Sequence, residues 1–218
     1  MSSVALIEAG VVLGAEQTEG ARQHAEALAP MLARVVRCIE ADQIRAVACD
    51  VGPGPYSGLR VAIASAIACG LAWNVPVFGI CSLDAIAAAV LASAAPDDGF
   101  GVAIDARRNE VYWAWYSVDG DRAAGPRVAR RDELPSEYAA GRWFDSEFPH
   151  ASWVARSVER LLDEGATAAV DDVPLVAHGD DGGDTATALA GRVLLAPRPL
   201  YLRRPDVTVS SATVSGPR

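Results

Sequence analysis

The sequence predicts an α/β protein, and three observations carry this prediction. A short apolar run at residues 47–49 leads through a Gly/Pro-rich loop into a long apolar helix, which is a strand–loop–helix pattern. Residues 21–40 and 151–163 show helical periodicity, with apolar and charged side chains on opposite faces. Residues 110–118 alternate as a strand does. Of the 218 residues, 51% are hydrophobic, which is enough for a substantial core.

The first half is expected to mix strands and helices. Residues 3–16 are interpreted as a hairpin with its turn at residues 8–10. Residues 21–40 follow as an amphipathic helix, in which Pro30 marks a kink or a start. Two strand–helix pairs come next, with Ser57 and Ser82 as the expected helix N-caps. These pairs cover residues 44–50, 57–73, 76–80 and 83–94.

The second half begins again with strands, after a Pro/Asp/Gly stretch at residues 95–99 that is the best domain boundary. A loop-rich aromatic stretch is expected at residues 135–150. The expected regular elements are strands at 100–105, 110–118, 127–134 and 173–177, and helices at 151–163 and 185–191. The predicted domains are therefore residues 1–97 and 98–207, with a flexible tail at 208–218.

The loop before the long helix resembles a phosphate-binding loop but lacks its chemistry. The chain contains no lysine, which a Walker A loop requires. Pro53 and Pro55 have no backbone N–H to donate, and Ser57 stands where a dinucleotide-binding fingerprint has its third glycine. We therefore expect a rigid loop that binds anions poorly.

Small residues form two rows along the helix at residues 57–73. One row has Gly58, Ala62, Ala66 and Gly70, and the other has Ala64, Ala68 and Ala72. Side chains this small let another helix or strand approach closely. Two interpretations remain open: the helix is buried inside its own domain, or it packs against a partner helix.

Composition favours a cytoplasmic protein without a membrane partner. A net charge of −9 repels phosphate backbones, so the chain alone is not expected to bind RNA tightly. The four cysteines lie in apolar segments without C-x-x-C spacing, which indicates reduced core residues. The N-terminus lacks the basic region of a signal peptide, and the longest uncharged apolar run, at residues 61–73, is too short to span a bilayer.

No residue pattern indicates a catalytic, metal or cofactor site. His24, His150 and His178 are scattered, without the spacing of a helical metal site. Asp105 and Glu110 could pair as acid and base, but a hairpin turn with salt-bridged arginines is the simpler interpretation. The acidic stretch at residues 180–184 lacks the EF-hand spacing and is interpreted as a solvated loop.

Several segments resemble one family. GPGPYSGLR (52–60) resembles the GPGSFTGLR-type signature of the TsaB (YeaZ) family, and IDARRNEVYWAWY (104–116) is similar to its DARRxEVY-type segment. PLYLRRPDV (199–207) resembles its C-terminal YLR element, and VAHGDDG resembles its late strand–GDG loop. The segment that starts with His24-Ala-Glu resembles its first helix. The matches follow the family's order.

The resemblance implies an actin-like (ASKHA, RNase H-like) fold of two related α/β domains. It implies a non-catalytic scaffold or activator subunit of the complex that adds threonylcarbamoyl to N6 of adenosine 37 in tRNAs reading codons that begin with A. The implied partners are the catalytic paralogue TsaD and the ATPase TsaE, which carry the ATP and metal. The resemblance also implies a homodimer when these partners are absent. It implies that the chain contacts tRNA only through the complex and that this chain itself holds no cofactor.

The resemblance also assigns residues, because helices of the family's N-terminal domain form a bundle with the partner. The implied interface residues are His24, Gly58, Arg60, Ala62, Ala66 and Gly70. The signature loop itself contributes Gly52, Pro53, Gly54 and Ser57.

The sequence departs from the family at its start. Family members carry a strand of the type LAIDTS before the segment that matches SVALIEAG, whereas this sequence starts at Met1-Ser2-Ser3. The first strand, from the middle of the first sheet, is therefore expected to be missing, which leaves strand edges unpaired. Two alternative functions remain: an O-sialoglycopeptidase-type metallopeptidase, which needs a histidine pair, and an ATP-dependent small-molecule kinase relative, which binds nucleotide by itself.

Overall fold

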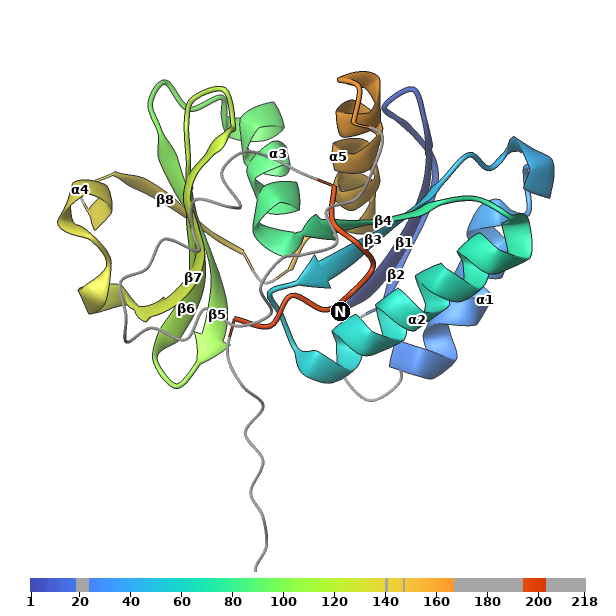
Figure 1. Cartoon of the computed structure of the whole chain (residues 1–218), viewed down its shortest axis with the longest axis horizontal. Coiled ribbons are helices and arrows are strands. Elements are labelled where there is room, and N and C mark those ends of the chain that lie inside the picture. Colours follow the sequence, from blue (N-terminus) through green and yellow to red (C-terminus); the bar gives the residue numbers. More distant parts are fainter. Residues whose placement is uncertain (19–23, 140, 147, 167–193, 203–218) are drawn as a thin grey trace, which may run out of the picture.

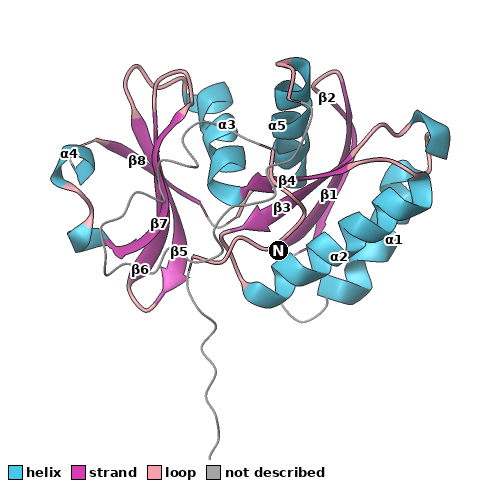
Figure 2. Ribbon diagram, viewed as in Figure 1, coloured by secondary structure: helices cyan, strands magenta, loops and turns pink. Residues whose placement is uncertain are grey.

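The computed structural model describes residues 1–18, 24–139, 141–146, 148–166 and 194–202. Strands and helices mix in the first half of the chain, and a four-stranded sheet dominates the second half, which confirms the predicted α/β class (Figures 1 and 2). The two halves lie side by side, with helix α3 (Ser82–Ala94) between them (Figure 1).

The predicted N-terminal hairpin is present. Strands β1 (Ser2–Glu8) and β2 (Val11–Thr18) pair antiparallel. Ala9 and Gly10 form the turn between them with φ angles of 48° and 74°. The second of these angles suits glycine, which has no Cβ to clash with its own backbone.

Helix α1 (His24–Val36) packs on the hairpin and is shorter than the predicted residues 21–40. Its Met31 and Val35 are buried against Val4 of β1. Pro30 lies inside α1, on its exposed side, rather than at its start. The short 3-10 helix η1 (Ala41–Gln43) follows.

The two strand–helix pairs occur in the predicted order. They are β3 (Val47–Gly52), α2 (Tyr56–Trp73), β4 (Val77–Cys81) and α3. Strands β3 and β4 pair in parallel, so α2 is the crossover that joins them. Helix α2 packs on these strands and lies beside α1 (Figure 1).

Both predicted helix N-caps are wrong by one or two positions. Pro55 and Cys81 hold the N-cap positions with extended backbones, so Ser57 and Ser82 lie inside the first turns of α2 and α3. The Ser82 hydroxyl donates instead to Asp50 Oδ1 at 2.6 Å, and Ser57 is exposed. Tertiary contacts therefore take priority over local capping at Ser82.

The second half contains a sheet with strand order β7-β6-β5-β8. Its strands are β5 (Phe100–Arg107), β6 (Glu110–Tyr116), β7 (Arg122–Arg130) and β8 (Arg142–Ser146), with the short helices η2 (Arg131–Glu133) and α4 (Ser136–Ala139) between the last two. Strand β8 was expected to be loop. It is a five-residue edge strand parallel to β5, held by Phe144 against Phe100 on one face and by Trp143 against Trp113 on the other.

Two later segments return to the first half. Helix α5 (Ala151–Asp163) packs on β1, β3 and β4, where Val154 and Val158 share a buried cluster with Phe78. Leu195 forms an antiparallel bridge with Gly79 of β4. Elements from the predicted second domain thus complete the first half, and the domain boundary at residue 97 stays a prediction.

The sheet of the first half is divided in two. The β1–β2 pair and the β3–β4 pair form separate two-stranded sheets. Within the described ranges, no strand pairs with the second edge of β1 or of β3.

A buried polar cluster joins the two halves. The Tyr116 hydroxyl of β6 donates to Asp84 Oδ1 of α3 at 2.8 Å, and Arg122 Nη1 of β7 lies 3.3 Å from the same oxygen. All three residues are buried. Burial and the Asp84 carboxylate together raise the pKa of Tyr116, so it remains a neutral donor.

Candidate partner-binding surface

The signature loop is a packed structural element. Gly52 N–H donates to Asp50 Oδ1 at 2.9 Å, the Gly52–Pro53 peptide bond is cis, and Pro53 is fully buried. Gly52 has a φ of 106°, and a Cβ on it would lie 3.0 Å from Leu59 Cδ1 and 3.1 Å from the Leu200 carbonyl oxygen. Only glycine fits here without strain.

Substitution of two glycines of the same motif by alanine is therefore expected to change the free energy of unfolding in opposite directions. Gly52→Ala should lower the free energy of unfolding by about 1–3 kcal/mol, because it combines a disfavoured φ with a backbone contact. Gly58→Ala should raise it by about 0.5–1 kcal/mol, because Gly58 lies in α2 with open space around its Cβ. Urea unfolding of the two variants measures both changes, and equal effects would contradict this account.

The C-terminal motif docks on the signature loop. Leu200 N–H donates to the Val51 carbonyl at 2.7 Å, and the Tyr201 ring stacks on Tyr56 at 4.5 Å. Arg60 Nε donates to the Tyr201 hydroxyl at 2.8 Å, and its guanidinium lies near both rings. Arg60, a predicted interface residue, thus fastens the C-terminal segment to α2.

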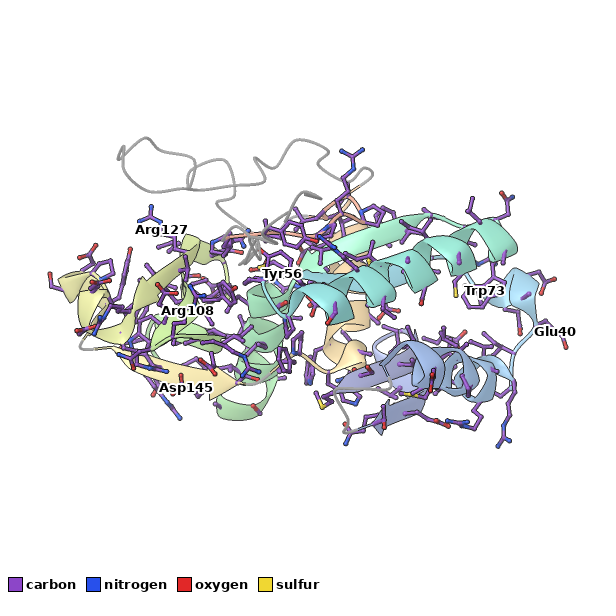
Figure 3. The ribbon with its side chains drawn as sticks, turned by 90° about the horizontal axis from the view of Figure 1, so that it is seen from below. Glu40, Tyr56, Trp73, Arg108, Arg127 and Asp145 are labelled. Atoms are coloured by element: carbon purple, nitrogen blue, oxygen red, sulfur yellow. The ribbon has the colours of Figure 1, made fainter. Side chains whose placement is uncertain are left out.

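The third motif supplies the β5–β6 turn. Arg107, Arg108 and Asn109 all have positive φ angles, and Arg107 N–H donates to Asp105 Oδ1 at 2.8 Å. Arg107 lines the same cavity as Gly54 and Ser57 of the signature loop. Figure 3 shows Tyr56 near the middle of the molecule and Arg108 to its side, in the half that holds the four-stranded sheet. The hairpin turn predicted at residues 105–110 is confirmed, and the salt bridges expected of its arginines stay a prediction.

The first row of small residues on α2 faces inward. Ala66 is 7% exposed, and a Cβ on Gly70 would collide with the Val77 side chain. Gly58 and Ala62 line a cavity beneath the helix. The side chain of His24, at the start of α1, lies outside the described parts. The structure therefore places Ala66 and Gly70 against their own domain, and their contact with a partner stays a prediction.

The second row of small residues faces solvent. Its positions continue into an apolar stripe, which we call the outer stripe of α2, formed by Ala64, Ile67, Ala68, Leu71 and Ala72. Leu71 is 80% exposed and Ile67 is 38% exposed. An uncharged stripe with a fully projecting leucine is unusual on an exposed helix and is typical of a surface that binds another protein. In the sequence, this surface was indicated by the second row of small residues along α2.

By length and mean hydropathy alone, α2 is also the one helix in the described ranges that could cross a membrane. Its Leu59, Ile63 and Ala66 are buried, and the helix packs on β3. Core helices of soluble proteins meet the same criterion, so this feature is weak support for membrane insertion.

Asp50 is a titratable group next to the signature loop. Burial raises its pKa to about 6, although hydrogen bonds from Ser82 and from Gly52 N–H act in the opposite direction. The folded state therefore binds the proton more tightly than the unfolded chain, and the charged carboxylate costs stability as the pH rises from about 4 to about 6.

Asp50→Asn should remove this dependence. Relative to the parent, the variant is expected to gain up to about 3 kcal/mol at pH 7 and almost nothing at about pH 3, where Asp50 is mostly protonated in both the folded and the unfolded chain. Chemical unfolding at about pH 3 and pH 7 tests the difference. A gain that is the same at both pH values would show that packing, rather than charge, is responsible.

Cys49 and Cys81 are free, buried thiols with little reactivity. Burial raises the pKa of Cys49 and of Cys81 to about 12. Cys38 is exposed, so the core position predicted for it is wrong. Among the residues that the structure describes, no three His, Cys, Asp or Glu side chains come together as metal ligands. The GDG loop at residues 178–184, including His178, lies outside the described residues.

This chain is similar to known proteins. The family model described as "TsaD: tRNA N6-adenosine threonylcarbamoyltransferase" matches residues 15–169. An uncharacterized protein of Mycobacterium tuberculosis is 45% identical over 120 residues, which are 54% of this chain and 54% of that protein. The Escherichia coli protein named "tRNA threonylcarbamoyladenosine biosynthesis protein TsaB" is 32% identical over 100 residues, 45% of this chain and 43% of that protein. This chain spans about half the length of the curated relatives it matches.

Solved structures of known proteins are also similar to this chain in their fold. An uncharacterized Pseudomonas aeruginosa protein with similarity to peptidase YEAZ aligns with a TM-score of 0.65 and 25% identity, over 75% of this chain and 87% of that chain. YeaZ from Pseudomonas aeruginosa aligns with a TM-score of 0.65 and 24% identity over the same shares. Together with the family match, these likenesses support the predicted actin-like fold.

Proposed function

Because this chain belongs to the TsaB (YeaZ) branch of the TsaD family, we propose that it is a non-catalytic subunit of the complex that adds threonylcarbamoyl to N6 of adenosine 37 in tRNAs reading codons that begin with A. In this proposal it binds the catalytic paralogue TsaD directly and works with the ATPase TsaE. The ATP and metal belong to those partners, and the complex acts in the cytoplasm.

The outer stripe of α2 is the observation that carries this proposal. It presents Ile67 and Leu71 to solvent on a helix whose opposite row is fixed to its own core. Helix α1 lies beside it, so two helices offer a ready surface for a helical partner (Figure 3). Without TsaD, the same stripe on a second copy would be the partner, which gives a homodimer.

The electrostatics favour indirect contact with tRNA. The net charge of −9 opposes binding to a phosphate backbone, so the partner subunits supply that contact. The signature loop contributes structure rather than phosphate binding, because its prolines lack N–H donors and its glycine is packed against Leu200.

Reconstitution of the reaction tests the proposed role. The reaction contains TsaD and TsaE from the same organism, ATP, a threonylcarbamoyl donor and tRNA. It should form modified adenosine faster when this chain is added. This chain alone should form none. Modification by this chain without TsaD, or a rate with TsaD and TsaE that this chain does not change, would contradict the proposal.

A further inference from the structure

Helix α2 carries a single charged side chain. Of its 18 residues only Arg60 is charged, and its first turn contains no acidic residue. Arg60 is exposed, and Ala64 and Ala68 follow it at four-residue spacing on the same side of the helix. Figure 3 shows Tyr56, one turn before Arg60, at one end of α2 and Trp73 at the other. The outer stripe is therefore an apolar surface with one cation at its N-terminal end.

The C-terminal segment holds the Arg60 side chain in place. Leu200 and Leu202 are buried, so they anchor the backbone on both sides of Tyr201. The Tyr201 ring stacks on Tyr56, and its hydroxyl accepts a hydrogen bond from Arg60 Nε at 2.8 Å. The guanidinium carbon lies 5.7 Å from the centre of the Tyr201 ring and 6.0 Å from that of Tyr56. A guanidinium held in this way loses less conformational entropy when it binds a ligand.

The Arg60 guanidinium lacks a counter-charge within the described parts of the chain. No aspartate or glutamate there forms an ion pair with it. The tyrosine rings attract the positive charge but do not neutralise it. Tyr201 uses Nε, and the Nη nitrogens carry the remaining donors. An oxyanion that accepts from both Nη nitrogens would supply the counter-charge in a bidentate pair.

Two kinds of oxyanion match these donors, a protein carboxylate and a nucleic-acid phosphate. The net charge of −9 opposes a phosphate backbone. The exposed side chains that follow Arg60 along α2 are apolar, and Ile67 and Leu71 are the largest of them. Apolar side chains with a charge at the rim are typical of a contact between proteins. The surroundings of Arg60 therefore favour a carboxylate.

We propose that Arg60, held by Tyr56 and Tyr201, binds an aspartate or glutamate of the partner protein at the N-terminal end of the outer stripe. The inference rests on the proposed function, because it adds a charged contact to the same surface. Leu71 lies about 16 Å from Arg60 along the helix axis, at about 1.5 Å per residue. A helical partner carries its carboxylate about three turns from the side chains that contact Leu71. This ion pair fixes the direction of the partner on α2, and it makes the C-terminal segment part of the binding surface.

The salt dependence of the complex tests this contact on the full chain. Titration calorimetry with TsaD should show tighter binding by the parent at about 50 mM salt than at about 500 mM. Arg60→Gln should weaken binding about tenfold at the lower salt concentration and about twofold at the higher one. Arg127→Gln, which removes an exposed arginine of β7, is the matched control and should bind as the parent does. An equal loss by Arg60→Gln at both concentrations would show that Arg60 only holds the C-terminal segment, which would overturn the inference.

Charge reversal identifies the carboxylate on the partner. Arg60→Glu should bind TsaD more weakly than Arg60→Gln does, because it places like charges together. Among TsaD variants with one surface aspartate or glutamate changed to arginine, one should restore binding to Arg60→Glu but not to Leu71→Arg. If none restores it, the inference is wrong.

The outcomes separate this inference from the proposed function. A parent complex with TsaD and an unchanged affinity of Arg60→Gln would overturn the inference alone, whereas no complex with the parent chain would overturn both. Unchanged affinity for TsaD, together with weaker retention of tRNA by the assembled complex, would assign Arg60 to a phosphate and also overturn the inference.

Discussion

Replacement of Leu71 by arginine is expected to weaken the proposed complex with TsaD strongly while leaving the fold intact. Leu71 is 80% exposed, so the free chain loses almost no packing. In the complex, the same position would be the centre of a desolvated apolar contact, and an unpaired guanidinium there should cost about 2 kcal/mol or more. Affinity measured by titration calorimetry should therefore fall at least about 30-fold.

The matched control for this experiment is Val118→Arg. Val118 is another exposed apolar residue, at 46%, and it lies just after β6 in the second sheet, away from the outer stripe. The same change in charge there should leave affinity unchanged. Equal loss in both variants would indicate a general charge effect, and no loss in Leu71→Arg would exclude the outer stripe as the contact.

Replacement of Arg122 by methionine is expected to be the most destabilising of these changes. Arg122 is the positive partner of Asp84 in the buried cluster, and both side chains are almost completely buried. Without it, the Asp84 carboxylate keeps the Tyr116 hydrogen bond but loses its counter-charge. Breaking a buried ion pair from one side costs about 3–5 kcal/mol, which is a large part of the stability of a typical domain.

Urea unfolding measures this loss, and Arg127→Met provides the control. Arg127 lies on the same strand and is exposed, so its replacement should change stability by less than about 0.5 kcal/mol. A loss below about 1 kcal/mol in Arg122→Met would show that Asp84 is neutral or solvated in the folded state, and that the cluster does not hold the two halves together.

Local pattern in the sequence was enough to predict most of the helices and strands. The alternating run of β6, the apolar faces of α1 and α5, and the Gly/Pro loop before α2 each carry their own signal. Strand β8 was missed because five residues at a sheet edge show too little alternation. Its position depends on Trp143 and Phe144 packing against residues of β5 and β6 that are far away in the chain.

The candidate site was less predictable, because it depends on contacts over long separations. Arg60 stays a predicted interface residue, and its hydrogen bond to Tyr201, 141 residues later, is visible only in the structure. The two rows of small residues on α2 were visible, yet the sequence could not say which row faces Val77 and which faces solvent. The Asp84–Arg122 pair gave no sequence signal, since α3 and β7 meet only in the folded chain.

The mass of the mixture of this chain with TsaD tests the central claim most directly. Light scattering after size separation, with and without ATP, should show a one-to-one complex that neither protein forms alone. Leu71→Arg should remove that species, and Val118→Arg should keep it. Two separate species at all concentrations, with a stable monomer of this chain that hydrolyses ATP by itself, would contradict the assignment as a non-catalytic partner.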